Sequence, residues 1–420
     1  MQFLVVVQGS YGDLNPCLAI ALGLRERGHR VLFVTTEFYA PLMTSLGLEF
    51  VSILSRQEHL RISSHPDFNH PFRSFGFTAR ELLVGLMRAE YQAIADLHDP
   101  GHTVVLALGL PLGARIANEK LGVPMATLAH FPPWMRSVYG PHGLSGRKAP
   151  LLLRKFLRNL FDLRMNALVA PEISRFRSEL NLPPIRGLYV DWLYSPQLIL
   201  GLFPDWYASP QPDWPPNVSL TGFPIFDGIE AKELQVELED FLRAGDPPLV
   251  INALSGYHSA RQFFEISVAA VRRLRRRAIL LSQFSENVPP GLPPEIRHFG
   301  YVPHTLLLPR TAGIVHQGGI GTTAKAMLAR IPQLIVPVNF DQPYNARCVT
   351  TLGVGAMLRP RQYQPDRLVR ELESLLGSSS VAERLHAYGA QIQMQDGVAE
   401  ACQRLAHVFC EERQALGSRK

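Results

Sequence analysis

Two segments of the chain open with the same pattern, an apolar run followed by a glycine turn and a helical stretch. Residues 2–8 run into Gly9-Ser10-Tyr11-Gly12, and residues 248–254 run into Ser255-Gly256. Buried runs that alternate with helices of about 10–15 residues are typical of parallel sheets built from βαβ units. The pattern predicts an α/β protein with two Rossmann-like, doubly wound parallel-sheet domains.

The length and the prolines predict how these domains are divided. A chain of 420 residues exceeds one ordinary core. Six prolines between 204 and 224 predict an irregular linker at 204–228. We expect one domain at 1–203, a second at 229–400 and a C-terminal helix at 401–420 that packs back toward the first. Parallel sheets bind ligands beyond their carboxyl ends, so a cleft between two such domains is the expected site.

The composition narrows the class of protein. The net charge of +6 is compatible with anionic ligands or a lipid surface and does not require nucleic acid. No apolar run reaches the roughly 18 residues that cross a membrane, and the N-terminus has no basic lead-in. The four cysteines have no metal-ligand spacing. A reduced cytoplasmic protein is expected, and the sequence does not indicate its oligomeric state.

Residues 147–177 predict a basic amphipathic helix. Six cationic side chains alternate there with leucines, phenylalanines and a methionine, from Arg147 and Lys148 to Arg164 and Met165. A surface helix packed on its own domain is the favoured interpretation. Peripheral contact with the inner face of a membrane is the alternative.

The loop at 313–324 is the most informative stretch. An apolar strand ends at His316, the chain turns through Gly318, Gly319 and Gly321, and a helix follows. Glycines allow close approach to a ligand, and a new helix presents unpaired N–H groups. We predict an anion site, most simply for phosphate, with Thr322 as a further donor. A merely tight turn is the alternative.

The same loop mimics a dinucleotide fingerprint. Residues 319–324 match G-x-G-x-x-A, and Asp341 follows at the spacing of a ribose-binding acid. The motif, however, lies at least three strands into its domain rather than after the first. An NAD-dependent dehydrogenase is therefore disfavoured.

Residues 298–346 resemble the donor-binding signature of the inverting GT-B nucleotide-sugar glycosyltransferases of the UDP-glycosyltransferase superfamily. The matching pieces are, in order, Tyr301 with Pro303, His316 to Thr322, Ile331-Pro332, and Asp341 to Ala346. The glycine of the superfamily's G-x-P is missing, because Arg330 stands there. Over nearly its full length the chain further resembles the rhamnosyltransferases of rhamnolipid biosynthesis.

The resemblance implies a metal-independent, inverting hexosyltransferase without a cofactor, which uses a nucleoside-diphosphate sugar as co-substrate. No D-x-D pair occurs that would bridge a metal to the diphosphate. A helix N-terminus plus a histidine would supply positive potential for the departing diphosphate. The resemblance implies that the diphosphate is bound by His316, Gly318, Gly319, Gly321 and Thr322, with help from Ser255. Tyr301 and the Val302 backbone would contact the base. Asp341 and Gln342 would bind hydroxyls of the sugar.

The nucleotide is less well defined than its diphosphate. Many relatives hold the ribose hydroxyls with a glutamate eight residues after the histidine, and here that residue is Ala324. A missing ribose ligand favours dTDP and leaves UDP open.

Transfer to an alcohol by single displacement needs a base. Residues 12–16 resemble the superfamily's G-H-x-N-P turn, with Asp13 in place of the histidine. With Asn15 as the N-cap and Pro16 at the first helical position, Asp13 is not needed as a cap. Asp13 is the predicted base, although it needs a raised pKa or a polarised substrate; a purely electrostatic role at the helix is the alternative. His130 is the second candidate.

The acceptor side is predicted from the first domain. Residues 55–90 and 130–146 are rich in aromatic and aliphatic side chains, and Ser10, His130 and Trp134 are acceptor-side candidates. A hydroxyl on a lipophilic acceptor, such as a β-hydroxy fatty acyl chain, fits these loops, although core packing explains any one residue equally well. The alternatives are a flavonoid, macrolide or other aglycone and, outside this class, a non-catalytic nucleotide-sugar binder.

Overall fold

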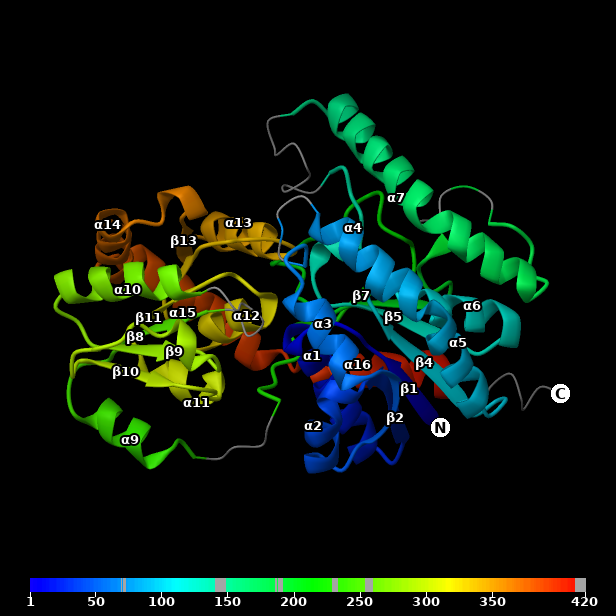
Figure 1. Cartoon of the computed structure of the whole chain (residues 1–420), viewed down its shortest axis with the longest axis horizontal. Coiled ribbons are helices and arrows are strands. Elements are labelled where there is room, and N and C mark those ends of the chain that lie inside the picture. Colours follow the sequence, from blue (N-terminus) through cyan, green and yellow to red (C-terminus); the bar gives the residue numbers. More distant parts are fainter. Residues whose placement is uncertain are drawn as a thin grey trace. The chain divides into compact units, whose positions relative to one another are not determined.

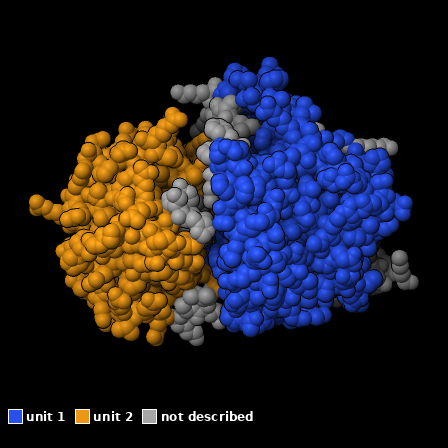
Figure 2. Space-filling model, viewed as in Figure 1, with its two compact units in different colours: residues 1–226, 396–420 blue, residues 227–395 orange. Residues whose placement is uncertain are grey.

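The computed structural model describes residues 1–68, 70, 73–139, 149–185, 187, 192–228, 233–253 and 260–411. The chain divides into two compact units (Figure 2). Unit 1 comprises residues 1–226 with 396–420, and unit 2 comprises residues 227–395. Each unit is built on one parallel sheet.

Unit 1 contains a seven-stranded parallel sheet in the order β3-β2-β1-β4-β5-β6-β7 (Figure 1). Its strands are β1 (Gln2–Val6), β2 (Arg30–Thr36), β3 (Glu49–Leu54), β4 (Thr103–Leu108), β5 (Met125–Ala129), β6 (Leu198–Gly201) and β7 (Val218–Leu220). Its α-helices are α1 (Tyr11–Glu26), α2 (Ala40–Ser45), α3 (Arg56–Ser64), α4 (Ser74–Thr78), α5 (Gly85–Leu97), α6 (Leu112–Leu121), α7 (Leu151–Glu179) and α16 (Gly397–Ala406).

Both faces of this sheet are covered, which explains why its strands are apolar throughout. Successive side chains of a strand point to opposite faces. Phe3 and Val5 of β1 lie in a core with residues of α1 and α16. Leu4 and Val6 lie in a second core with residues of α5 and α6. The prediction of a doubly wound sheet is confirmed for this unit.

The proline-rich stretch contains a strand, contrary to the prediction of an irregular linker. Val218–Leu220 forms β7, which pairs with β6 from Ile199↔Val218 to Gly201↔Leu220. The prolines flank this segment, so residues 217–221 keep every N–H group. Because β7 lies at the edge of the sheet, it needs a partner on one side only.

The end of the chain returns to unit 1. Helix α16 packs on α1 closely enough that a Cβ added to Gly23 would lie 3.0 Å from Cys402 Sγ. Cys402 Sγ lies 3.6 Å from the Ile20 carbonyl oxygen. Unit 2 ends at residue 395, and α16, which begins at Gly397, belongs to unit 1.

Unit 2 contains a six-stranded parallel sheet in the order β10-β9-β8-β11-β12-β13. Its strands are β8 (Leu249–Asn252), β9 (Ala278–Leu281), β10 (Ile296–Phe299), β11 (Gly313–His316), β12 (Gln333–Ile335) and β13 (Gly355–Met357). Its α-helices are α9 (Val236–Arg243), α10 (Arg261–Arg273), α11 (His304–Leu307), α12 (Ile320–Leu328), α13 (Gln342–Leu352), α14 (Pro365–Leu376) and α15 (Ser379–Met394).

Helix α7 is the long helix predicted at 147–177, and it runs along the outside of unit 1 (Figure 1). Its second half is anchored by Met165, Val169, Ile173 and Phe176, which are buried in a core with residues of α6. Arg147 and Lys148 lie outside the described residues. Among the described residues, no helix is both long and apolar enough to cross a bilayer.

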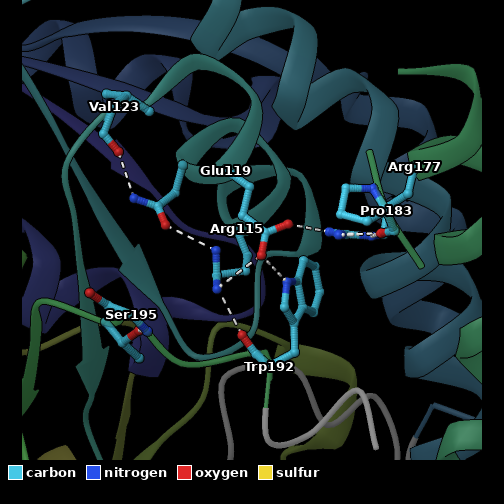
Figure 3. Close-up of polar contacts among 9 residues, drawn as sticks. Arg115, Glu119, Val123, Arg177, Pro183, Trp192 and Ser195 are labelled. Carbon is cyan, nitrogen blue, oxygen red and sulfur yellow. Dashed lines mark hydrogen bonds and ion pairs between the residues drawn. The ribbon is translucent and has the colours of Figure 1, made fainter. Parts of the chain in front are cut away.

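An ionic cluster ties α6 and α7 to the segment that precedes β6 (Figure 3). Glu119 accepts a hydrogen bond from Trp192 Nε1 at 2.7 Å and pairs with the buried Arg177. Arg115 donates to the Trp192 carbonyl oxygen at 2.8 Å, and both guanidinium groups lie 5.2 Å from the Trp192 ring centroid. One carboxylate therefore neutralises two arginines that would otherwise be poorly solvated.

Replacing Glu119 by Gln should lower the free energy of unfolding by about 3 kcal/mol, because Arg177 then keeps a buried charge without its counter-ion. Urea denaturation at neutral pH measures the change. Glu172→Gln is the matched control, since the Glu172–Arg175 pair is exposed and should cost less than about 1 kcal/mol. Equal losses in the two variants would contradict the role given to Glu119.

Candidate active site

The loop between β1 and α1 holds the Asp13 carboxylate against the backbone. Asp13 Oδ2 accepts hydrogen bonds from the Ser10 N–H at 2.7 Å and from Ser10 Oγ at 3.0 Å. Gly9 has φ +107°, and a Cβ there would lie 2.5 Å from Asp13 Oδ2. Only glycine therefore permits this turn.

The predicted cap of α1 is wrong. Ser10 is the N-cap, and Ser10 with Asp13 forms a capping box at the start of the helix. Pro16 lies inside α1 rather than at its first position. The helix begins earlier than predicted because the Ser10 side chain and the Asp13 carboxylate together satisfy its first N–H groups. Asp13 thus has a structural role that sequence reasoning denied it.

Asp13 also pairs with His130, which directly follows β5. Asp13 Oδ1 lies 3.2 Å from His130 Nε2, and the side chains are 27% and 6% exposed respectively. Burial by itself would raise the pKa of Asp13, but the hydrogen bonds and charge of His130, with the bonds from Ser10, lower this pKa below its usual value. Of the two alternatives given by the sequence, a raised pKa is therefore not found; a polarised substrate stays open, and Asp13 is ionised at neutral pH.

His130 and Trp134 each bury an unused polar atom. His130 Nδ1 and Trp134 Nε1 are inaccessible and have no hydrogen-bond partner among the described residues. If Nε2–H of His130 donates to Asp13, Nδ1 carries a lone pair, whereas Trp134 Nε1–H can only donate. Both atoms are buried, so the loop after β5 does not present them at the surface.

His316, at the end of β11, is buried and neutral. Its Nε2 lies 3.0 Å from Gln333 Oε1, and its Nδ1 accepts the Gly318 N–H at 3.1 Å. Burial lowers the pKa of His316 to about 4. Desolvation outweighs the Gln333 hydrogen bond, so this histidine adds no positive charge at neutral pH, and its role at the diphosphate stays a prediction. What His316 does is hold the backbone of the glycine loop.

The glycine loop opens the N-terminus of α12. Gly318 has φ +95°, and a Cβ there would lie 2.6 Å from Ile335 Cγ2. Asn345 Nδ2 donates to the Gly318 carbonyl oxygen at 2.9 Å and to Asp341 Oδ2 at 2.7 Å. The loop is thus held from two directions, by β12 and by α13.

Asp341 and Gln342 lie at this loop, but their side chains already hold backbone groups. Asp341 Oδ2 accepts the Ile320 N–H at 3.2 Å. The buried Gln342 accepts N–H groups of Val338 and Asn339 through Oε1, at 2.8 and 3.2 Å. The N–H groups of Gly321 and Thr322 belong to the first turn of α12, which has no intrahelical partner for them. These two groups are available as anion donors.

An ion pair near Tyr301 was missed by sequence reasoning. Lys325 of α12 lies 2.5 Å from Asp227 Oδ1, and both side chains are buried. Asp227 Oδ2 also accepts Thr305 N and Oγ1 at 3.0 and 2.5 Å, and the Tyr301 hydroxyl donates to the Asp227 carbonyl oxygen. Burial would raise the pKa of Asp227, but Lys325 lowers it. The pair fixes the exposed Tyr301 relative to the glycine-loop helix.

Of the two remaining predicted donor-binding residues, the structure describes Val302 and does not describe Ser255. Val302 is buried next to Tyr301. Ser255 lies outside the described residues. Within the described residues, no group of three or more His, Cys, Asp or Glu side chains could hold a metal ion.

Comparisons with known proteins match this arrangement. Residues 3–140 match the glycosyltransferase family 28 N-terminal domain, and residues 278–406 match the erythromycin biosynthesis protein CIII-like C-terminal domain. The O-mycaminosyltylonolide 6-deoxyallosyltransferase of Streptomyces fradiae is 29% identical, with 96% of each chain covered. The chain is a glycosyltransferase of the GT-B fold. The predictions of this fold and of a hexosyltransferase are confirmed.

Solved structures share the fold of this glycosyltransferase at low sequence identity. The kitacinnamycin glycosyltransferase superposes with a TM-score of 0.74 at 21% identity, covering 97% of this chain and 99% of the other. The spinosyn rhamnosyltransferase SpnG, in complex with thymidine diphosphate, superposes with a TM-score of 0.68 at 19% identity, covering 96% and 100%. The narrower resemblance to rhamnolipid rhamnosyltransferases stays a prediction.

The predicted acceptor loops of the glycosyltransferase separate into core and surface residues. Phe77, Leu86 and Met135 are buried in unit 1, whereas Phe75 and Tyr139 are exposed. Phe72 and residues 140–146 lie outside the described residues. The alternative of ordinary core packing therefore holds for the first three side chains.

The neutral state of His316 predicts a pH dependence of stability. In the unfolded chain an imidazole titrates near pH 6.5, whereas the folded pKa is about 4. The unfolded state therefore binds the proton first as the pH falls, and stability is lost between about pH 6.5 and 4. From pH 7 to pH 5 this loss is about 2 kcal/mol. Urea denaturation at both pH values measures the free energy of unfolding. Its decrease from pH 7 to pH 5 should be smaller in His316→Gln than in the unmodified protein, by about 2 kcal/mol. The same pH dependence in both proteins would mean that His316 titrates normally in the folded state.

Proposed function

We propose that this glycosyltransferase transfers a hexosyl group, with inversion, from a nucleoside-diphosphate sugar to a hydroxyl of a lipophilic acceptor. The observation that carries the proposal is the Asp13–His130 pair. It supplies an ionised, partly exposed carboxylate at the carboxyl end of the unit 1 sheet, where parallel sheets bind ligands. Single displacement requires such a proton acceptor.

The lowered pKa of Asp13 is compatible with this role. The acceptor hydroxyl oxygen forms a bond to the anomeric carbon while the bond from that carbon to the diphosphate oxygen breaks. As the new bond forms, the oxygen becomes positively charged and its proton becomes strongly acidic. A carboxylate that is ionised beforehand takes this proton without a raised pKa. His130 is then a positioning residue, which fixes one oxygen of Asp13 while Ser10 fixes the other.

The donor is assigned to unit 2. The N–H groups of Gly321 and Thr322 would bind the diphosphate, with Gly318 and Gly319 shaping the loop and His316 holding it. Tyr301, fixed through its hydroxyl, would stack on the base beside the Val302 backbone, and Asp341 and Gln342 would border the sugar. Because this site is neutral at His316, the leaving diphosphate is stabilised by backbone dipoles.

We favour a dTDP-sugar, and L-rhamnose as its sugar. Ala324 is buried in α12 and presents no carboxylate to ribose hydroxyls. Structures of the same fold include the glycosyltransferase SsfS6 and the spinosyn rhamnosyltransferase SpnG, each in complex with thymidine diphosphate. The name of the second protein describes a rhamnosyltransferase. The resemblance to rhamnolipid rhamnosyltransferases points the same way.

Two acceptor classes remain candidates. The rhamnolipid resemblance favours a β-hydroxy fatty acyl chain. The relative that acts on O-mycaminosyltylonolide and the fold relative that binds spinosyn aglycone favour a small aglycone. The exposed Phe75 and Tyr139 suit a lipophilic molecule in either case.

Titration calorimetry with dTDP, UDP and NAD⁺, followed by a mass-spectrometric acceptor panel with the preferred donor, tests the function. We expect dTDP to bind at least tenfold more tightly than UDP, and NAD⁺ not to bind. Transfer to β-hydroxy acyl chains or to aglycones then decides the acceptor class. Preference for UDP would contradict the inference that Ala324 favours a dTDP-sugar. The absence of turnover with every donor and acceptor would contradict the proposed reaction.

Asp13→Asn should reduce kcat at least about a thousandfold, since Asn keeps the hydrogen bond to Ser10 but accepts no proton. The dissociation constant of dTDP should not change. His130→Gln should reduce kcat only about tenfold and move the acid limb of the kcat profile to higher pH, because His130 lowers the pKa of Asp13. The reverse order, with His130→Gln inactive and Asp13→Asn active, would make His130 the base.

A further inference from the structure

The first half of α7 has its polar side facing the protein and its apolar side facing solvent. Leu152, Phe156, Leu160 and Leu163 follow the spacing i, i+4, i+8, i+11, so they form one stripe on the helix. All four are exposed, with Leu152, Phe156 and Leu163 at 80%, 62% and 59%. We call these four residues the outer stripe.

A second stripe with the same spacing, offset by two residues, lies on the opposite side of the helix. It consists of Arg154, Arg158, Asp162 and Met165. Arg158 donates to Asp213 at 3.0 Å, and the buried Asp162 pairs with Arg136. These ion pairs fix the rotation of α7, so the outer stripe cannot turn inward without leaving buried charges unpaired.

The outer stripe is too long for a small acceptor. Eleven residues of helix separate its ends, a rise of about 17 Å. Exposed Phe161 extends the apolar surface to exposed Phe75 of α4, with the two rings 5.1 Å apart. Contiguous apolar surface of this size marks an interaction site rather than scattered exposure.

The charges around the outer stripe fit an anionic partner. Between residues 151 and 171 the only acid is Asp162, which is buried. The exposed cations Lys155 and Arg164 flank the stripe on either side. An apolar face bordered by cations is the arrangement with which interfacial helices bind anionic lipid.

We propose that the outer stripe of α7 docks the protein on an anionic membrane surface, with Leu152, Phe156 and Leu163 inserted among the lipid chains and Lys155 and Arg164 at the headgroups. The site lies on unit 1 and is independent of the donor residues. The favoured interpretation from the sequence holds for the packing, because both halves of α7 contact unit 1; the outer stripe adds an apolar face that this packing leaves exposed. The docking would bring the enzyme to acceptors that reside in the bilayer.

Vesicle sedimentation of the full chain tests this inference. The protein should sediment with mixed phosphatidylcholine–phosphatidylglycerol vesicles, and less with phosphatidylcholine alone. Leu152→Ser/Phe156→Ser/Leu163→Ser should reduce the partition coefficient at least tenfold. Lys155→Glu/Arg164→Glu should abolish the preference for the anionic vesicles. Since all five side chains are exposed, the unfolding midpoint and the dissociation constant of dTDP should not change.

Val236→Ser/Met394→Ser is the matched control, because both side chains are as exposed as those of the stripe but lie in unit 2. This control should bind vesicles like the unmodified protein. Equal binding by the triple variant would overturn the inference. So would light scattering that shows a dimer which the triple variant converts to monomer, since the stripe would then cover a second copy.

Discussion

Parallel strands buried on both faces are the constraint on which the rest of the structure depends. In such a sheet every strand must be followed by a crossover, so the turns from strand to helix gather at one edge. The candidate residues follow this rule: Asp13 comes after β1 and His130 after β5, Tyr301 after β10 and His316 at the end of β11. The chemistry is therefore confined to the carboxyl edges of the two sheets before any side chain is considered.

The charge of the candidate residues differs between the two sheet edges. At the edge of unit 1, two hydrogen-bond partners outweigh desolvation and keep the Asp13 carboxylate ionised. At the edge of unit 2, desolvation outweighs one hydrogen bond and keeps His316 neutral. Under the proposed function, the acceptor would meet a negative group in unit 1 and the donor would meet backbone N–H groups in unit 2. For a reaction that takes a proton from one substrate and develops negative charge on the other, this division is the useful one.

The sequence predicted the elements well and their local details less well. Apolar runs and glycine turns identify strands because they report burial directly. The cap of α1 was misplaced because Asn15-Pro16 suits a helix start, whereas Ser10 with Asp13 satisfies more N–H groups. Arg330 has φ +59°, the conformation that explains the superfamily's glycine, so the missing glycine left the turn intact. The Asp227–Lys325 pair joins residues 98 positions apart and left no local pattern.

Helix α7 shows why the rest could not be predicted. Its sequence carries an apolar stripe and a polar stripe, and a period of 3.6 residues identifies both without saying which faces the protein. Apolar residues usually face inward, and the first half of α7 departs from that rule. The orientation is decided by Asp213 and Arg136, which are distant in sequence and offer charges that only the polar stripe can neutralise. Tertiary ion pairs therefore keep an apolar surface exposed, which argues that the surface has a partner.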